Sequence, residues 1–179
     1  RGMSKRLIVT ALLTLCAALV SSSVPADGPG GYGARRKDAE TEYQRTARDA
    51  YGIGYAQIES ADRLDLDAAA ATDEPTRQRV LALAREKYRE ALSAFKESVH
   101  LEPDMYEAHT YIGYANRKLG QYDAALAAYA QALRLKPDYA RAIQYQGEAY
   151  LGLDRFDEAR FSYLRLYALD SVEAQMLLD

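Results

Sequence analysis

The sequence predicts an all-α fold, an α-solenoid of about three helical hairpins, the first elongated, with a C-terminal capping helix. Small and aromatic residues recur at a separation of 34 positions, and a fixed period of this size is typical of stacked copies of one supersecondary unit. The composition, rich in Ala, Leu, Glu and Arg with only 5 Pro in 179 residues, also favours helix. The matching pairs are Gly113 and Gly147, Tyr122 and Phe156, Ala125 and Ala159, Tyr129 and Tyr163, and Leu135 and Leu169.

Residues 1–26 are typical of a secretory signal peptide, because a short basic start precedes an uncharged apolar run and small residues then follow. Val24 and Ala26 suit positions −3 and −1 of a signal peptidase site. The apolar run, 7–20, is shorter than the roughly 20 residues of a spanning helix. We therefore expect a cleaved signal and an exported, periplasmic protein. A retained membrane anchor, which would make the N-terminal segment the only membrane contact, and a lipoprotein signal at Cys16 are the alternatives.

The charge balance argues against a nucleic-acid partner. Cleavage after Ala26 would leave 20 Lys and Arg against 26 Asp and Glu, and a net acidic domain without a basic cluster binds nucleic acid poorly. The same cleavage would remove the only cysteine. Residues 27–37 begin with a Gly- and Pro-rich stretch, so we expect a flexible tether there.

The segment 38–103 is expected to form an elongated helical hairpin. Apolar residues at spacings of three and four predict a helix on each side of residues 64–76, which the sequence leaves open as helix or loop. Asp73 is a plausible N-cap of the second helix, with Pro75 in its first turn. Acidic residues in this segment, such as Asp65, are expected to be solvated.

Two regular hairpins follow, each marked by similar signals. Asp104 and Asp138 precede the first helix of each and are expected to begin or cap it. Gly120 supplies a left-handed turn, and Pro137 ends the second helix. Ser171 stands where the next Pro would be and is expected to cap a short terminal helix. The predicted segments are 104–137, 138–171 and the capping helix 172–179.

These residues resemble the tetratricopeptide repeat (TPR) family. The family places Gly at position 8, Ala at position 20 and an aromatic residue at position 24, which here are Gly113, Ala125 and Tyr129. The resemblance covers roughly residues 45–170 and makes 38–103 a degenerate first repeat. It implies a non-catalytic protein–protein interaction module, which the signal peptide would place in the bacterial cell envelope.

In this family the first helix of each hairpin lines a concave groove, which binds a peptide or helix of a partner protein. Tyr and Arg dominate binding hot spots, and the groove positions here are rich in both, although several of these Tyr could instead bridge neighbouring helices. The family's carboxylate clamp is not expected, because Tyr111 and Tyr145 stand where Asn and a basic residue would be needed. The groove candidates are Arg48, Tyr51, Tyr55, Thr110, Tyr114, Arg117, Arg141, Gln144 and Glu148.

No catalytic motif, metal-ligand spacing or cofactor motif is found, so we expect neither an enzyme nor a cofactor. His109 is expected to pack and His100 to be solvated. The alternative to a groove-binding module is an assembly or oligomerisation factor, pilot- or scaffold-like, that uses the elongated first hairpin. A homo-oligomer is therefore possible.

Overall fold

The computed structural model describes residues 31–176, and it describes side chains over 42–169. The chain divides into two compact units, Arg1–Asp38 and Ala39–Asp179, and the account below concerns the second. The predicted signal peptide, 1–26, lies outside the described residues. None of the helices within residues 31–176 has the length and apolarity that a membrane crossing requires.

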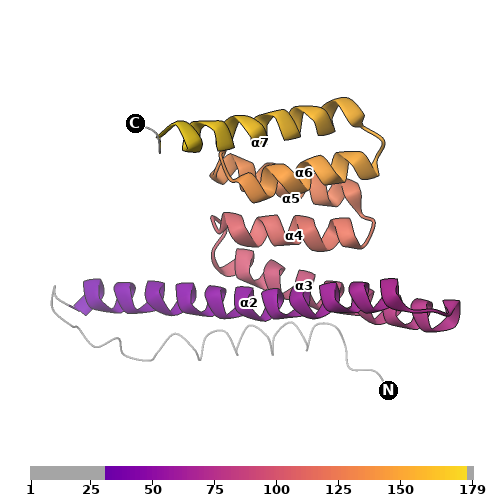
Figure 1. The fold of residues 1–179 in the computed structure, drawn as a ribbon. Coiled ribbons are helices and arrows are strands. Elements are labelled where there is room, and N and C mark those ends of the chain that lie inside the picture. The colour runs from indigo at the N-terminus through magenta and orange to yellow at the C-terminus, as the bar shows by residue number, and fades with distance from the viewer. Residues whose placement is uncertain (1–30, 177–179) are drawn as a thin grey trace, which may run out of the picture. The chain divides into compact units, whose positions relative to one another are not determined.

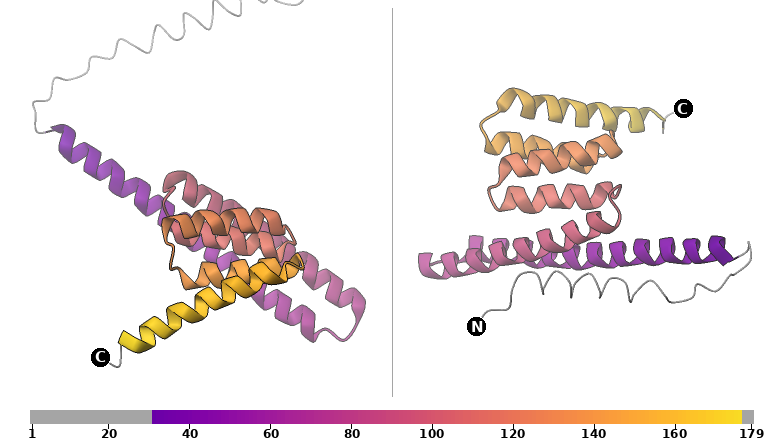
Figure 2. Two further views of the ribbon diagram at one scale, coloured as in Figure 1. Left: turned by 90° about the horizontal axis from the view of Figure 1, so that it is seen from above. Right: turned by 180° about the vertical axis from the view of Figure 1, so that it is seen from behind.

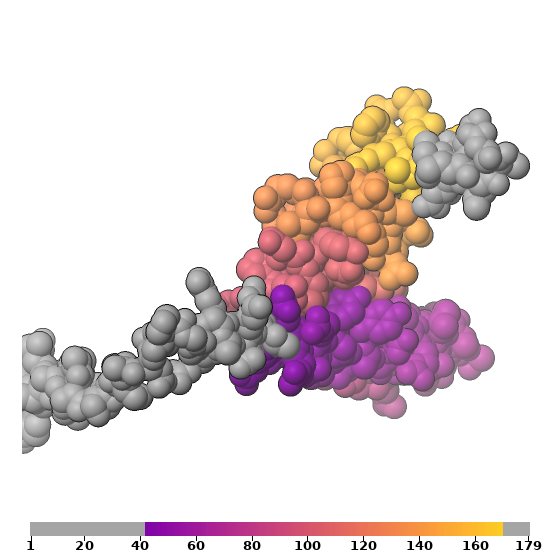
Figure 3. All heavy atoms as spheres, turned by 90° about the vertical axis from the view of Figure 1, so that its left-hand side faces the viewer, coloured from indigo at the N-terminus to yellow at the C-terminus, as the bar shows by residue number. Residues whose placement is uncertain are grey.

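Six helices account for nearly all of the described chain, and this confirms the all-α prediction. Figure 1 shows the regular helix pairs stacked on one another, and the two further views in Figure 2 show the same order. In Figure 3 the repeats pack as successive layers along the stack. The helices are α2 (Gly31–Ala70), α3 (Glu74–Leu101), α4 (Tyr106–Lys118), α5 (Tyr122–Leu135), α6 (Ala140–Gly152) and α7 (Phe156–Met176).

The first hairpin has a short tip. Helix α2 continues through most of residues 64–76 and ends at Ala70, so only 71–73 connect it to α3. Asp73 caps α3 as predicted, since its carboxylate accepts a hydrogen bond from the Thr76 N–H at 2.8 Å. The extra length of this hairpin is thus helical.

Helix α2 already begins at Gly31, inside the segment 27–37 for which a flexible tether is expected. Over 31–37 the structure has helix instead, and residues 27–30 lie outside the described residues. The helix-forming run from Ala34 to Lys37 accounts for the difference, because intrinsic helix propensity is high for Ala, Arg and Lys.

One contact recurs in all three hairpins: a glycine of the first helix faces an aromatic ring of the second. A Cβ at Gly113 would lie 2.3 Å from the Tyr129 ring, and one at Gly54 would lie 2.9 Å from the Phe95 ring. At Gly147 the nearest atoms include the Tyr163 ring at 3.4 Å. The two helices of each hairpin therefore approach closely at this glycine, and Gly54 is the counterpart of Gly113 in the elongated first hairpin.

The helix starts differ slightly from the prediction. Met105 and Tyr139, not Asp104 and Asp138, are the N-caps of α4 and α6, and neither makes a side-chain cap bond. The predicted aspartate caps are wrong because each aspartate lies one residue too early to reach the free N–H groups of the first turn.

The two regular hairpins differ in their turns and in how their second helices end. Gly120 has a φ of 77°, as the predicted left-handed turn requires, and Asp154 takes the same region with a φ of 56° in the second hairpin. Helix α7 continues through Ser171 to Met176, so the capping segment is an extension of α7 and not a new helix at Ser171. Ser171 keeps the backbone N–H that Pro137 lacks, which lets the helical hydrogen bonds continue.

The largest buried cluster joins α2, α3 and α4. Small residues such as Ala61, Ala91 and Ala115 are fully buried there and let the helix axes approach, while Tyr88 and Phe95 fill the remaining space. This packing places the first helices, α2, α4 and α6, at one side of the stack, where α4 also contacts α6 directly.

Candidate functional site: the face of the first helices

Tyrosine side chains form a continuous row across the three first helices. In order across α2, α4 and α6 they are Tyr51, Tyr55, Tyr111, Tyr114 and Tyr145, which we call the tyrosine row. Neighbouring ring centroids lie 6.3 Å apart for Tyr51 and Tyr55, and 5.3 Å apart for Tyr55 and Tyr111. The row continues at 6.2 Å to Tyr114 and 4.9 Å to Tyr145. These separations are typical of interacting aromatic pairs.

Burial disfavours ionisation of four hydroxyls of this row, those of Tyr51, Tyr111, Tyr114 and Tyr145. It raises the pKa of Tyr51 to about 12 and also raises the pKa values of Tyr111, Tyr114 and Tyr145. For Tyr114 the neighbouring Asp62 carboxylate adds to the effect, because it accepts a hydrogen bond that only the protonated hydroxyl can donate. At neutral pH these four side chains therefore carry no negative charge.

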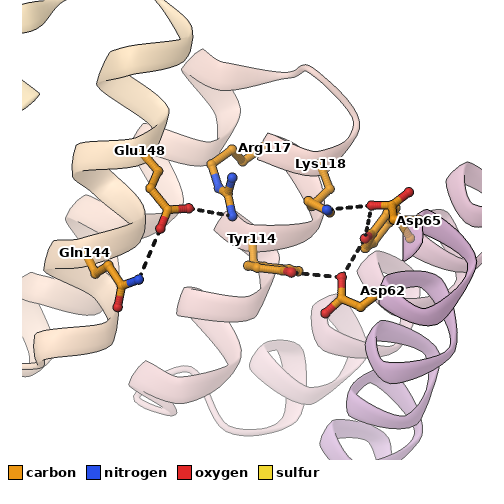
Figure 4. Close-up of polar contacts among 8 residues, drawn as sticks. Asp62, Asp65, Tyr114, Arg117, Lys118, Gln144 and Glu148 are labelled. Carbon is orange, nitrogen blue, oxygen red and sulfur yellow. Dashed lines mark hydrogen bonds and ion pairs between the residues drawn. The ribbon is translucent and has the colours of Figure 1, made fainter. Parts of the chain in front are cut away.

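Asp62 of α2 bonds to Tyr114 of the row, and Asp65 bonds to the neighbouring Tyr88 and Lys118. Asp62 accepts hydrogen bonds from the hydroxyls of Tyr88 at 2.6 Å and Tyr114 at 2.8 Å. Asp65 accepts from Tyr88 at 2.8 Å and forms an ion pair with Lys118 at 2.5 Å (Figure 4). The expectation that Asp65 is solvated is therefore wrong. Asp62 and Asp65 are three residues apart, so they share one face of α2, next to the buried Ala61. This spacing is the signal in the sequence that could have predicted their contacts with other helices.

An ion pair joins α4 to α6. Arg117 and Glu148 lie 2.9 Å apart, and Gln144 donates to the same carboxylate at 3.1 Å (Figure 4). The Arg117 guanidinium also lies 5.1 Å from the ring centroid of Tyr114 and 5.5 Å from that of Tyr145. Burial disfavours its charge, but Tyr129 and Glu148 outweigh that effect and raise the pKa of Arg117. The predicted groove residues Arg117, Gln144 and Glu148 thus contact one another.

The remaining predicted groove residues differ in accessibility. Arg141 is exposed, and it donates to the Tyr111 hydroxyl at 2.7 Å. Arg48 is exposed and makes no ion pair with the residues whose side chains are described. Thr110 is fully buried and donates to the Tyr106 carbonyl at 2.9 Å. Thr110 therefore offers no surface to a guest, although Tyr114 and Arg117 of the same helix are part-exposed.

The two histidines do not form a site with other ligands. His109 is part-buried, with its Nε2 2.8 Å from the Pro103 carbonyl oxygen, whereas His100 is exposed. Within the part of the chain that the structure describes, no group of three or more His, Cys, Asp or Glu residues is arranged to hold a metal ion.

Stacked hairpins whose first helices share one accessible face define the chain as a helical-repeat protein of the solenoid class. The family model "Tetratricopeptide repeat" matches residues 80–140 and 113–174, which together exceed half of the chain. The chain belongs to the tetratricopeptide repeat family. This fold is a non-catalytic interaction module, and its domains mediate contacts between proteins.

Solved structures with the same fold include one described as "Second TPR of Spaghetti (RPAP3) bound to HSP90 peptide SRMEEVD". It is 15% identical, covers 74% of this chain and 98% of its own, and has a TM-score of 0.51. A crystal structure of MamA is 20% identical, covers 85% of this chain and 99% of its own, with a TM-score of 0.48. The Sgt2 TPR domain from Aspergillus fumigatus is 19% identical, covers 63% and 67%, and has a TM-score of 0.47. No curated protein matches the sequence.

Proposed function

We propose that this protein binds a peptide or a helix of a partner protein on the face of its first helices. The observation that carries the proposal is the tyrosine row across α2, α4 and α6, in which Tyr55 is exposed, Tyr51, Tyr114 and Tyr145 are part-exposed, and the buried Tyr111 links them. Rigid aromatic side chains provide large contact areas with little loss of conformational entropy. A TPR structure of the same fold is bound to a peptide, which supports a peptide as the guest.

The polar groups around the row suggest how a guest would be held. Arg117 and Glu148 already neutralise each other, so they add little net charge to the face. Arg48 and Arg141 are exposed, and Arg141 keeps donors for a guest carboxylate or backbone carbonyl beyond the one that it gives to the Tyr111 hydroxyl. We therefore propose aromatic stacking along the centre and arginine contacts at the rim.

The test uses residues that can be changed without unfolding the protein. Tyr55 is 37% exposed and Arg141 is exposed, whereas Tyr114 is bonded to Asp62 and its replacement would perturb the fold. A photo-crosslinking amino acid at Gln144 identifies the partner in cells. Calorimetry with the crosslinked segment then compares the wild type with Tyr55→Ala/Arg141→Ala. The matched control is Tyr167→Ala/Arg160→Ala on the exposed surface of α7.

We expect the Tyr55/Arg141 double variant to bind at least about 30-fold more weakly, in line with two hot-spot residues at about 1–2 kcal/mol each or more. The α7 control should bind like the wild type. Equal affinity of the Tyr55/Arg141 double variant and the wild type, with both folded by circular dichroism, would reject the tyrosine row as the binding face.

A second candidate function is assembly of copies of this chain, and exposed apolar side chains at both ends of the stack favour it. On the first hairpin these are Ile53, Leu66 and Leu83, exposed by 60%, 70% and 58%. On α7 they include Phe161 and Tyr167, exposed by 69% and 74%. Large exposed apolar residues that gather in one place mark interaction surfaces. Light scattering of the wild type and of Leu66→Glu tests this role, which predicts a dimer or larger species that the substitution dissociates.

We also propose that the protein acts in a bacterial envelope after export, because the N-terminal sequence pattern is that of a secretory signal. Expression in a bacterium, periplasmic extraction and N-terminal sequencing test this proposal. A mature chain that begins at Asp27 supports a cleaved signal. An uncleaved chain in the membrane fraction supports the retained anchor, and an uncleaved chain in the cytoplasm overturns export.

A further inference from the structure

The elongated first hairpin contributes most of the lining of a cleft. Helices α2 and α3 extend beyond the C-terminal end of α4, so the tip of the hairpin projects past the stack (Figures 1 and 2). A cavity of about 380 Å³ opens where this projecting part meets the end of α4. We call it the overhang cleft. Six of its lining residues are Asp65, Ala68, Arg77, Leu81, Arg85 and Lys118.

The charges around the overhang cleft are unbalanced. It is lined by three cations, Arg77, Arg85 and Lys118, against one carboxylate, Asp65. Lys118 is paired with Asp65 at 2.5 Å. Arg77 is held by Glu74 at 2.8 Å and by the Ala71 carbonyl at 2.9 Å. Arg85 is exposed and makes no hydrogen bond or ion pair with the residues whose side chains are described. One positive charge therefore faces the cleft without a partner.

The rest of the lining is apolar. Leu81 and Ala68 form walls, and the buried Tyr88 lies at the base with Lys118 5.4 Å from its ring centroid. The volume is at the small end of the range for ligand pockets, which is about 300–1,000 Å³. Such a cleft has room for side chains beyond a single anionic group.

We propose that the overhang cleft is a second binding site, which takes an acidic segment of a partner protein with its carboxylate on Arg85 and an apolar side chain against Leu81. Arginine suits this role because its planar guanidinium binds a carboxylate through two hydrogen bonds. The whole chain carries a formal net charge of −3, so the local positive charge stands out against an acidic molecule. The site is separate from the tyrosine row and is independent of the function proposed for that face.

The experiment measures fluorescence anisotropy of a labelled nonapeptide made of three Asp-Glu-Leu repeats, titrated with the full chain. A peptide of three Asn-Gln-Leu repeats is the uncharged comparison. Three variants are compared with the wild type. Arg85→Glu reverses the free charge, Arg85→Lys retains it, and Arg79→Glu makes the same reversal on an exposed arginine of α3 outside the cleft.

We expect the acidic peptide to bind the wild type and Arg79→Glu alike, to bind Arg85→Glu at least about tenfold more weakly, and to bind Arg85→Lys with an intermediate affinity. Added salt should weaken the binding, because the pair is partly exposed. Equal affinities for Arg85→Glu and Arg79→Glu, equal binding of the uncharged peptide, or no binding at all would each overturn the proposal.

Two further arms distinguish the overhang cleft from the tyrosine row and from a lipid site. The Tyr55→Ala/Arg141→Ala variant should bind the acidic peptide normally. If it loses the peptide while Arg85→Glu keeps it, the peptide binds the tyrosine row and the cleft proposal fails. Vesicles of phosphatidylglycerol should not displace the peptide. If the vesicles bind in an Arg85-dependent way and the peptide does not, the overhang cleft binds a lipid headgroup, and the proposal of a protein segment is rejected.

Discussion

Tyr114 of α4 donates its hydroxyl to Asp62 of α2 across 2.8 Å, although the two residues are 52 positions apart in the chain. Tyr88 of α3 donates to the same carboxylate oxygen at 2.6 Å. One aspartate thus joins three helices and both of the first two hairpins. This arrangement ties the elongated hairpin to the regular repeats and holds the centre of the tyrosine row in place.

Replacing Asp62 should destabilise the protein strongly. Asp62→Ala leaves the hydroxyls of Tyr88 and Tyr114 without this acceptor, and we expect a loss of about 2–3 kcal/mol in the free energy of unfolding because the hydrogen bonds are charge-assisted and part-buried. Urea denaturation measures it. Asp67→Ala, an exposed acidic residue of the same helix, is the control and should change stability by less than about 0.5 kcal/mol. Similar losses for both would show that the bonds contribute little.

Replacing a glycine by alanine should change the stability of the protein in opposite directions at Gly113 and at Gly52. A Cβ at Gly113 would lie 2.3 Å from the Tyr129 ring, whereas a Cβ at Gly52 meets no atom within 4 Å. Gly113→Ala should therefore cost about 1–3 kcal/mol or more through overpacking. Gly52→Ala, in the middle of α2, should stabilise by about 0.5–1 kcal/mol. Thermal denaturation of both variants checks the pair, and a stable Gly113→Ala protein would contradict the close packing of α4 on α5.

Alkaline pH should weaken the fold through its buried tyrosines. Burial raises the pKa of Tyr51 to about 12, and burial together with the Asp62 and Asp65 carboxylates raises the pKa of Tyr88. A tyrosine in the unfolded chain ionises near pH 10. The stability that these groups contribute is fully present below about pH 10, and it falls as the pH rises towards the higher pKa values of the folded state.

Urea midpoints at about pH 8 and about pH 11 measure this effect, and Tyr88→Phe is the informative variant. It cannot ionise at position 88, so its stability should fall less steeply than that of the wild type over this interval, even though it is less stable at neutral pH. A parallel fall in the two proteins would exclude Tyr88 as a source of the alkaline sensitivity.

Low pH should destabilise the start of α3, at the tip of the first hairpin. The hydrogen bond from the Thr76 N–H lowers the pKa of Asp73. Its contribution is present above the unfolded value of about 3.9 and is lost as the pH falls through the lower folded pKa. Asp73→Asn keeps a good N-cap that does not titrate. Its stability should match the wild type at neutral pH and exceed it in acid.

The control for this prediction is Asp73→Ala, which removes the cap at every pH and should be less stable than both proteins at neutral pH. Hydrogen exchange of the first amides of α3 locates the effect. If acid opens these amides equally in the wild type and in Asp73→Asn, the titrating group lies elsewhere.

Local features were well predicted from the residues. The repeat period, the turn at Gly120 and the cap at Asp73 all depend on interactions within one hairpin or one turn. Helix boundaries were less accurate, as at Asp104 and Ser171, because a boundary depends on which of several similar residues can complete a backbone hydrogen bond.

The pattern of residues by itself determined the fold class and the family resemblance, because small and aromatic side chains recur with the period of one helical hairpin. The resemblance in turn implied that the first helices share one side of the stack. Only the tertiary structure decided the states of particular side chains. It showed that Asp62 and Asp65 are bonded, that Thr110 is buried, and that Arg117 and Glu148 pair with each other while Arg85 has no partner among the residues whose side chains are described. The physical reason is that burial and charge pairing depend on residues from other helices, whose distances follow from the superhelical packing and cannot be deduced from spacing along one helix.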